Sequence, residues 1–406
     1  FGTDDTGLIT LVTHLPEYKR TALAAEYHRC FKRSVLKDIK NDTSGDYQNA
    51  LLACVKPPPV VWAEAMKGAM KGLGTSDALL INWLCLSKDH MDEVRAEFEE
   101  ANGKPLWKWI EGDCSGDYKY TLIALAQRNS EDRVEMLPIY WAQRIRDALD
   151  DVKTLNSLAA TLPGVVLKRG SEIFSAVYGE TLQTGIERKY KDGGFMGFSK
   201  YWKMAQERML EMPISIRVQA LYDAMNGWGT DEYTLTGLIC TIPENTHADV
   251  RKLYEERFGR KLIEHIESET SFCYKKLLVY ATMSKIESRC KALNGAMVGL
   301  GTDEKQLIRI ILCSTLKERM LIRETYNTMY ETDLIEHIES ELSGDFKAAM
   351  VAILESDQYT DEPDYEEDAN QLRDAIEGNA DDEDAMIRII ARKTPEQIEA
   401  FKEKYE

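Results

Sequence analysis

The apolar residues of this chain recur at intervals of three and four, which is the spacing of one buried face of an α-helix. A clear example follows Thr302, where Leu307, Ile308, Ile311 and Leu312 repeat with this period. Alternation with a period of two, which marks a half-buried strand, is absent along the sequence. The pattern therefore predicts an all-α protein.

The helical pattern is itself repeated. The segment Leu-Ile-Glu-His-Ile-Glu-Ser-Glu occurs at 262–269 and again at 334–341, and each copy ends 40 residues after the second glycine of a Gly-x-Gly-Thr-Asp-Glu loop. Related loops place this glycine marker at Gly2, Gly74, Gly229 and Gly301, at intervals of 72, 155 and 72 residues. Such a period predicts an array of repeats of about 70 residues, with one hidden near residue 150.

A short helix late in each repeat carries apolar residues four apart and a carboxylate three residues after the last of them. The matching sets are Phe31, Val35, Ile39 and Asp42; Leu106, Ile110 and Asp113; Phe258, Leu262, Ile266 and Glu269; and Tyr330, Leu334, Ile338 and Glu341. The hidden repeat fits through Tyr178, Leu182 and Ile186, but it has Lys189 at the carboxylate position and no glycine loop upstream. We expect it to keep the fold and to lack the site.

The repeats are predicted at 1–56, 60–128, 137–207, 214–285, 290–356 and 368–406. The first lacks its opening helix, and the last lacks its closing helices. In the sixth, Ala380 replaces the second glycine, and the carboxylate position falls beyond Glu406. The loop threonine is expected to cap the next helix, and a Ser-Gly-Asp cap opens another, except that Ser271-Phe272 replaces it in one repeat.

The loops have the chemistry of a calcium site. Glycine lets the backbone adopt left-handed conformations that turn carbonyls outward, and calcium takes six to eight oxygen ligands in flexible geometry. The carbonyls of Met70, Gly72 and Gly74 with a bidentate Asp113 would supply about five of these. The remaining positions could take water or an external phosphate oxygen, which suits calcium better than octahedral magnesium.

An apolar residue separates the two glycines of each intact loop, and these residues are Leu73, Trp228 and Leu300. At a loop apex such residues would be exposed, and beside a cation site they suit a lipid interface, where Trp is favoured. The alternative is that these side chains fold back against their own helices.

The combination of Met/Lys-Gly-x-Gly-Thr-Asp/Glu, an acidic residue about 40 positions on and a following Ser/Thr-Gly-Asp resembles the annexin repeat, over nearly the whole chain. The resemblance implies five-helix repeats stacked into a curved disc or superhelix, with calcium loops on its convex face. It also implies calcium-dependent, peripheral binding to acidic phospholipid membranes. The implied calcium ligands are Met70, Gly72, Gly74 and Asp113; Met225, Gly227, Gly229 and Glu269; Met297, Gly299, Gly301 and Glu341; and Gly2 and Asp42 of the first site.

The repeat number departs from that family, which usually has four or eight. Six repeats with two incomplete suggest a trimmed longer protein or an atypical member, and we expect the true N-terminus to lie upstream of Phe1.

The formal net charge is −18, from 69 acidic and 51 basic residues. This balance argues against nucleic acid, which needs a basic footprint, and against an anionic membrane unless bound cations supply positive charge. No apolar run reaches the length of a transmembrane helix. Eight cysteines without a Cys-x-x-Cys pair favour a reducing, cytoplasmic location.

An enzyme is disfavoured, because the six histidines show no His-Glu-x-x-His spacing and neither a phosphate-binding loop nor an EF-hand occurs. His265 and His337 share one repeat position and fit helix packing or a solvated face. The second alternative is a helical scaffold that binds cytoskeletal or other proteins, with calcium secondary.

Overall fold

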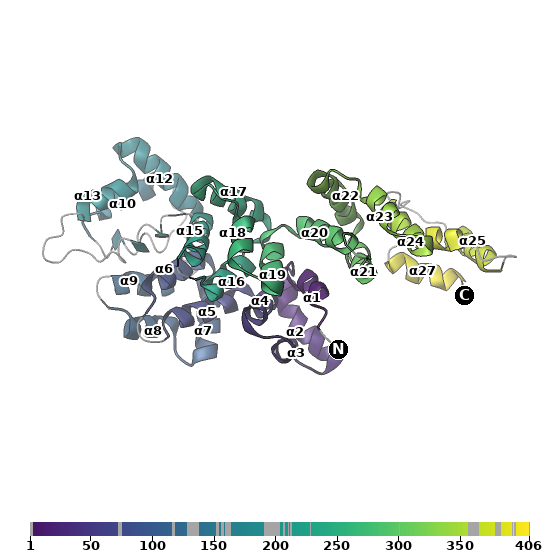
Figure 1. Cartoon of the computed structure of the whole chain (residues 1–406). Helices are drawn as coiled ribbons and strands as arrows, with labels where there is room; N and C mark the ends of the chain where they lie inside the picture. Colours follow the sequence, from purple (N-terminus) through teal and green to yellow (C-terminus); the bar gives the residue numbers. More distant parts are fainter. Residues whose placement is uncertain are drawn as a thin grey trace. The chain divides into compact units, whose positions relative to one another are not determined.

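The computed structural model describes residues 3–71, 75–115, 118–127, 138–151, 154–155, 158, 164–190, 204–205, 208–209, 211, 213–227, 229–299, 301–355, 365–377, 383–391, 393 and 395–405. Within these ranges every regular element is a helix and no strand occurs (Figure 1). The prediction of an all-α array is therefore confirmed. None of the described helices is both long and apolar enough to cross a lipid bilayer.

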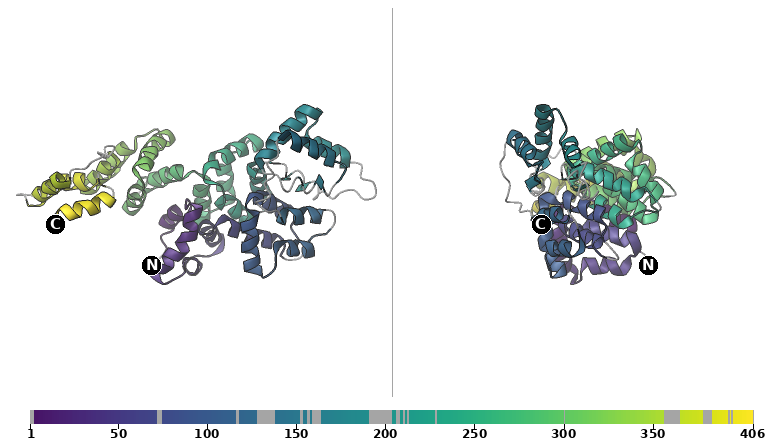
Figure 2. Two further views of the ribbon diagram at one scale, coloured as in Figure 1. Left: turned by 180° about the vertical axis from the view of Figure 1, so that it is seen from behind. Right: turned by 90° about the vertical axis from the view of Figure 1, so that its left-hand side faces the viewer.

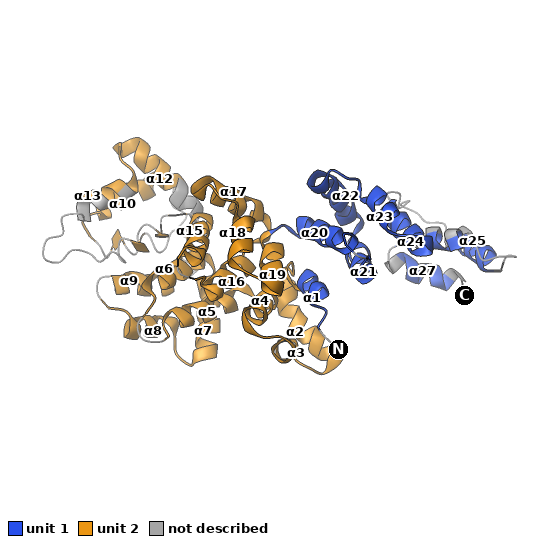
Figure 3. Cartoon of the chain, in the orientation of Figure 1, with its two compact units in different colours: residues 1–11, 283–406 blue, residues 12–282 orange. Residues whose placement is uncertain are grey.

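The chain divides into two compact units, one formed by residues 12–282 and the other by residues 1–11 with 283–406 (Figure 3). The helices of the first unit are α2 (Glu17–Phe31), α3 (Val35–Asp42), α4 (Gly45–Val55), α5 (Pro58–Ala69), α6 (Asp77–Leu86), α7 (Met91–Asn102), α8 (Leu106–Asp113), α9 (Tyr118–Ala126), α10 (Pro138–Ala148), α12 (Gly164–Tyr178), α13 (Leu182–Tyr190), α15 (Pro213–Met225), α16 (Glu232–Cys240), α17 (His247–Phe258), α18 (Leu262–Glu269) and α19 (Phe272–Thr282). The other unit contains α1 (Asp5–Val12), α20 (Lys285–Met297), α21 (Glu304–Leu312), α22 (Leu316–Tyr330), α23 (Leu334–Glu341), α24 (Gly344–Glu355), α25 (Tyr365–Glu377), α26 (Glu383–Ala391) and α27 (Pro395–Tyr405).

In the unit 12–282, helices far apart in sequence share one core. Helix α4 packs against α16 and α19, and α6 packs against α15 (Figures 1 and 2). The buried Cys54 and Cys240 thiols meet at this core with their Sγ atoms 3.5 Å apart. Arg217 of α15 is also buried, and it donates hydrogen bonds to the Leu238 carbonyl and, at 3.0 Å, to the Thr241 carbonyl. Because these carbonyls terminate α16, the arginine fixes α15 and α16 to each other.

Ion pairs and a small apolar cluster stabilise the other unit. Asp4 accepts a 2.6 Å contact from Arg309, which ties the N-terminal segment to α21. Ala369, Leu372, Ile389 and Phe401 form a small buried cluster among α25, α26 and α27. The segment after residue 365 therefore contributes its own core within this unit.

Glu318 links α20 to α22. Its carboxylate contacts Lys285 at 2.5 Å and Arg289 at 3.0 Å, and it accepts a hydrogen bond from the Thr315 N–H in a capping box. Burial alone would raise the pKa of Glu318, but the hydrogen bonds from Lys285, Thr315 and Arg289 outweigh it and lower the pKa to about 2. The two helices are thus joined by a carboxylate that stays ionised.

Four of the short helices follow the register that the sequence predicts. The two apolar positions four residues apart are buried in these helices: Leu106 and Ile110, Leu262 and Ile266, Leu334 and Ile338, and Leu182 and Ile186. In α3 only Ile39 is buried, whereas Val35 is half-buried and Phe31, which precedes the helix, is exposed. The pair Leu182 and Ile186 belongs to α13, which lies in the segment without a glycine loop, and each of its members is 4% exposed. The segment predicted to lack a site therefore buries its core positions as three of the others do.

Candidate metal centre

Three glycine loops begin at the carboxyl end of a helix and close in the same way. Met225 and Met297 are the last residues of α15 and α20, and Met70 directly follows α5. In each loop a backbone N–H reaches back seven residues, from Ser76 to the Ala69 carbonyl (2.7 Å), from Asp231 to Ala224 (2.8 Å) and from Asp303 to Ala296 (2.8 Å). Because the last carbonyls of a helix lack intrahelical partners, each loop starts from oxygen atoms that can bind a cation.

The glycines are required by the backbone of these loops. Gly229 and Gly301 have φ of +86° and +89°, and Gly299 has φ of +133°. A Cβ added to any of them would meet no atom within 4 Å, so the requirement is conformational rather than steric. Gly227 has φ outside the left-handed region. The other predicted loop residues, Gly2, Gly72, Leu73, Gly74, Trp228 and Leu300, lie outside the described residues.

The predicted carboxylates share one position. Each is exposed and is the eighth and last residue of its helix, as seen for Asp42 in α3, Asp113 in α8, Glu269 in α18 and Glu341 in α23. The helix macrodipole disfavours an anion at this end, and the last turns of α8, α18 and α23 contain no basic residue. A local rule broken in the same way several times indicates a functional reason for the carboxylate.

A threonine hydroxyl joins the loop to the residue with the predicted carboxylate in two repeats. The Thr230 hydroxyl donates to Oε2 of Glu269 at 3.3 Å, and the Thr75 hydroxyl donates to the Asp113 carbonyl at 3.2 Å. The prediction that these threonines cap the following helix is wrong. The N-caps are the next residues, Ser76, Asp231 and Asp303. Asp231 accepts from the Thr234 N–H at 3.0 Å and Asp303 accepts from the Gln306 N–H, whereas the Ser76 side chain makes no cap hydrogen bond. In the loop before α16 the Asp231 carboxylate takes the helix N–H, which leaves the Thr230 hydroxyl for Glu269.

The candidate donor atoms of these loops are oxygens. Within the described ranges, no group of three or more His, Cys, Asp or Glu side chains could hold a metal ion. Side chains alone therefore build no metal site there, and a candidate site would combine helix-end carbonyls with one exposed carboxylate. Such a set matches hard cations with flexible coordination, of which calcium is the best fit.

Two exposed apolar residues near these loops were missed by the sequence analysis as candidate contacts. Val298, between Met297 and Gly299, is 63% exposed. Phe272 is 89% exposed and has φ of +50°, at the position where Gly45 and Gly344 have φ of +63° and +61° in other repeats. The signal for Phe272 was its replacement of glycine in the Ser-Gly-Asp cap.

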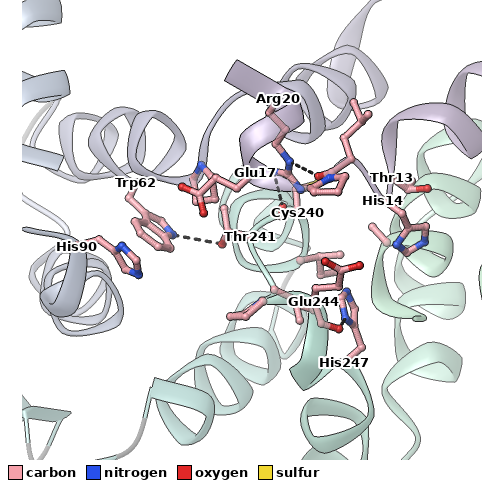
Figure 4. Close-up of a pocket in the computed structure, with 17 residues that line it drawn as sticks. Thr13, His14, Glu17, Arg20, Trp62, His90, Cys240, Thr241, Glu244 and His247 are labelled. Carbon is pink, nitrogen blue, oxygen red and sulfur yellow. Dashed lines mark hydrogen bonds between the residues drawn. The ribbon is translucent and has the colours of Figure 1, made fainter. Parts of the chain in front are cut away.

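A separate cavity of about 280 Å³ lies at the opposite end of α16 (Figure 4). It is lined by Trp62, His90 and Thr241 among others, whereas the glycine loop precedes the first residue of the helix. The nine residues of α16 separate the two ends by about 13 Å, at 1.5 Å per residue. Trp62 donates a 3.3 Å hydrogen bond to Thr241 at this cavity. The lining includes none of the predicted loop or carboxylate residues, so the cavity is not part of the candidate site.

The repeated histidines pack inside their repeats. His265 Nδ1 lies 2.6 Å from the Tyr254 hydroxyl, and His337 Nδ1 lies 2.7 Å from the Tyr326 hydroxyl. Burial lowers the pKa of His265, which favours its neutral form. Of the two expectations for these histidines, helix packing or a solvated face, these contacts favour helix packing.

Comparison with known proteins gives the family. The family model Annexin matches residues 1–54, 62–125, 217–281 and 289–353, which together are more than half of the chain. The chain therefore belongs to the annexin family, which is known for calcium-dependent phospholipid binding. Residues 126–216 lie between the second and third matches.

The curated relatives are annexins at low identity. Annexin A6 of Mus musculus is 24% identical over 458 residues, covering all of this chain and 66% of the relative, so the chain spans less than two thirds of its length. Annexin B22 of Schistosoma mansoni is 25% identical over 365 residues, covering 87% of this chain and 84% of the relative. Annexin A5 of Bos taurus is 26% identical over 288 residues, covering 68% and 88%.

Solved structures support the fold. Calcium-bound annexin (Sm)1 is similar with a TM-score of 0.60 and 24% identity, covering 69% of this chain and 85% of that one. Calcium-bound alpha-14 giardin is similar with a TM-score of 0.56 and 18% identity, covering 68% and 93%. These likenesses show the architecture of the helical repeats.

Proposed function

We propose that this protein binds acidic phospholipid membranes peripherally and only when calcium occupies its glycine loops. The ligands of each intact site would be the carbonyls of Met and two glycines with the carboxylate 39 or 40 residues downstream. The proposed sets are Met70, Gly72, Gly74 and Asp113; Met225, Gly227, Gly229 and Glu269; and Met297, Gly299, Gly301 and Glu341. Gly2 and Asp42 would belong to a fourth set.

The observation that carries this proposal is the contact between Thr230 and Glu269. It holds a carboxylate at the edge of a loop that starts from the helix-end carbonyl of Met225. Neither element makes a strong cation site alone, whereas carbonyls and a carboxylate together supply most of the ligands that calcium takes. The calcium-bound annexin (Sm)1 and alpha-14 giardin give further support from the same fold.

The charge of the chain explains why the cation would control membrane binding. A protein with a net charge of −18 is repelled by an anionic lipid surface. Bound calcium would supply local positive charge and coordination positions for lipid phosphate oxygens. The loop residues would position that charge, and Leu73, Trp228, Leu300 and the exposed Val298 would contact the headgroup region.

Sedimentation with vesicles of phosphatidylserine and phosphatidylcholine tests the proposal. The protein is expected to sediment with them in calcium and to stay in the supernatant with a chelator. Glu269→Gln should weaken calcium binding while far-UV circular dichroism stays unchanged. Lys189→Glu is the matched control, since it adds a carboxylate at the same helix position where no glycine loop exists, and it should add no calcium site.

Equal sedimentation with and without chelator would contradict the proposal. That result would favour the second candidate, a helical scaffold for cytoskeletal or other protein partners. A calcium site gained by Lys189→Glu, or none lost in Glu269→Gln, would show that the loop and the downstream carboxylate do not act together.

A further inference from the structure

Phe272 is a strained and exposed aromatic residue beside the Glu269 carboxylate. It opens α19 with φ of +50°, and 89% of its surface is exposed. A bulky side chain rarely adopts this backbone conformation, which glycine adopts freely. Gly45 and Gly344 stand at the same place in two other repeats with φ of +63° and +61°. The ring is therefore present where the fold would be better served by glycine.

The residues that flank Phe272 contact the glycine loop and the start of α16. It follows Glu269 by three residues, and Glu269 accepts the hydrogen bond from Thr230 of the loop. Tyr274, two residues further, donates to the Glu232 carbonyl at 3.0 Å, which fixes the start of α19 against the start of α16. Residues on both sides of Phe272 thus contact the loop or the helix that directly follows it, and the ring is exposed to solvent.

From this arrangement we propose that Phe272 is a membrane anchor that enters the boundary between lipid headgroups and acyl chains when the 214–285 site docks. The inference rests on the proposed calcium-dependent membrane binding and assigns it a contact outside the glycine loops. Aromatic residues on one apolar face insert at this depth in membrane-surface proteins. The polar neighbours of Phe272, among them Ser271 and Lys275, suit the headgroup layer around the ring.

A second copy of the chain is the rival occupant. A stable protein interface buries about 800 Å² on each partner around a core of several apolar residues. The four residues before Phe272, Ser268, Glu269, Thr270 and Ser271, are instead polar, so that segment adds no apolar side chain to the ring. A bilayer accepts a single inserted ring, so lipid is the better partner for this surface.

The test compares the full chain with Phe272→Gly and Phe272→Asn, which suit a positive φ but remove the ring. Both should weaken binding to phosphatidylserine vesicles at a fixed calcium concentration about tenfold, which is about 1.4 kcal/mol. Calcium binding without lipid, measured by calorimetry, should not change. Tyr18→Ala, which removes another exposed aromatic residue, should bind vesicles as the parent does.

Phe272→Trp provides a positive readout. The parent chain has seven tryptophans, so the emission of the added one is taken as a difference spectrum. It should shift to the blue and be quenched by brominated lipid when vesicles and calcium are both present.

Each contrary outcome is distinct. If the parent binds no vesicles, the proposed function fails and this inference fails with it. If the parent binds but Phe272→Gly binds equally and the Phe272→Trp spectrum does not move, the inference alone is overturned. If sedimentation velocity shows a dimer that Phe272→Gly converts to monomer, the ring belongs to a protein interface instead.

Discussion

Replacing Glu341 by glutamine should change the stability of its unit in opposite directions with and without calcium. Glu341 ends α23, where the helix macrodipole repels its charge, and the last turn of α23 has no basic residue to compensate. Without calcium, removal of this charge should raise the free energy of unfolding by about 0.3–1 kcal/mol.

With calcium present, the effect of Glu341→Gln on stability should have the opposite sign. At a free concentration one hundred times the Kd, binding stabilises the native state by about 2.7 kcal/mol. If loss of the carboxylate weakens binding about hundredfold, only about 0.4 kcal/mol of that stabilisation remains. After the dipole gain is subtracted, Glu341→Gln should be less stable than the parent by about 1.3–2 kcal/mol.

Glu336 provides the matched control because it is an exposed glutamate in the first turn of the same helix, where the dipole favours an anion. Glu336→Gln should lower stability by about 0.3–1 kcal/mol in chelator and should leave the calcium increment intact. Hydrogen exchange read by mass spectrometry on α22 and α24 peptides measures the stability of this unit in chelator and the increase in stability that calcium adds. Destabilisation of Glu341→Gln in chelator, or an undiminished calcium increment, would refute the reasoning.

Two further substitutions in the same unit test the loop and the ion pair. Gly301→Ala should lower the free energy of unfolding by about 1–2 kcal/mol because φ is +89°. Gly295→Ala, in the exposed interior of α20, should instead raise it by about 0.5–1 kcal/mol. Urea unfolding measures both variants, and a change of stability in the same direction for both would contradict the prediction. The folded pKa of Glu318, about 2, lies below its ordinary value, so its contribution is present above pH 4.5 and is lost as pH falls toward 2. Glu318→Gln should therefore cost on the order of 2–3 kcal/mol at pH 7 and much less near pH 2.5, as measured by unfolding at the two pH values.

Repetition made much of this fold predictable from sequence. The spacing of Leu262, Ile266 and Glu269 contains the period of the helix, its buried face and its last residue, and the structure confirms all three. Comparison between repeats even located Leu182 and Ile186, which no loop motif marks. These features are local, so a single sequence with several copies is enough to define them.

The features that the sequence did not show depend on tertiary contacts. Thr230 and Asp231 can each cap a helix by chemistry, and the choice between them follows from the closing hydrogen bond to Ala224 and from the nearby Glu269. The exposure of Phe272 and its positive φ likewise depend on how α19 meets α16. Periodicity carries no information about such approaches of distant segments.

The energetics of the repeat explain how a segment can lose its site and keep its fold. Full burial of a leucine or isoleucine contributes about 1.5–3 kcal/mol, and truncation of such a residue to alanine costs about 2–5 kcal/mol. A carboxylate at the end of the same helix opposes the dipole by about 0.3–1 kcal/mol when no cation is bound. A segment with another residue at this position, as the one with Lys189 has, therefore needs no carboxylate for its stability. The residues that the fold does not need, and that it even disfavours, are for this reason the ones that most clearly mark the candidate site.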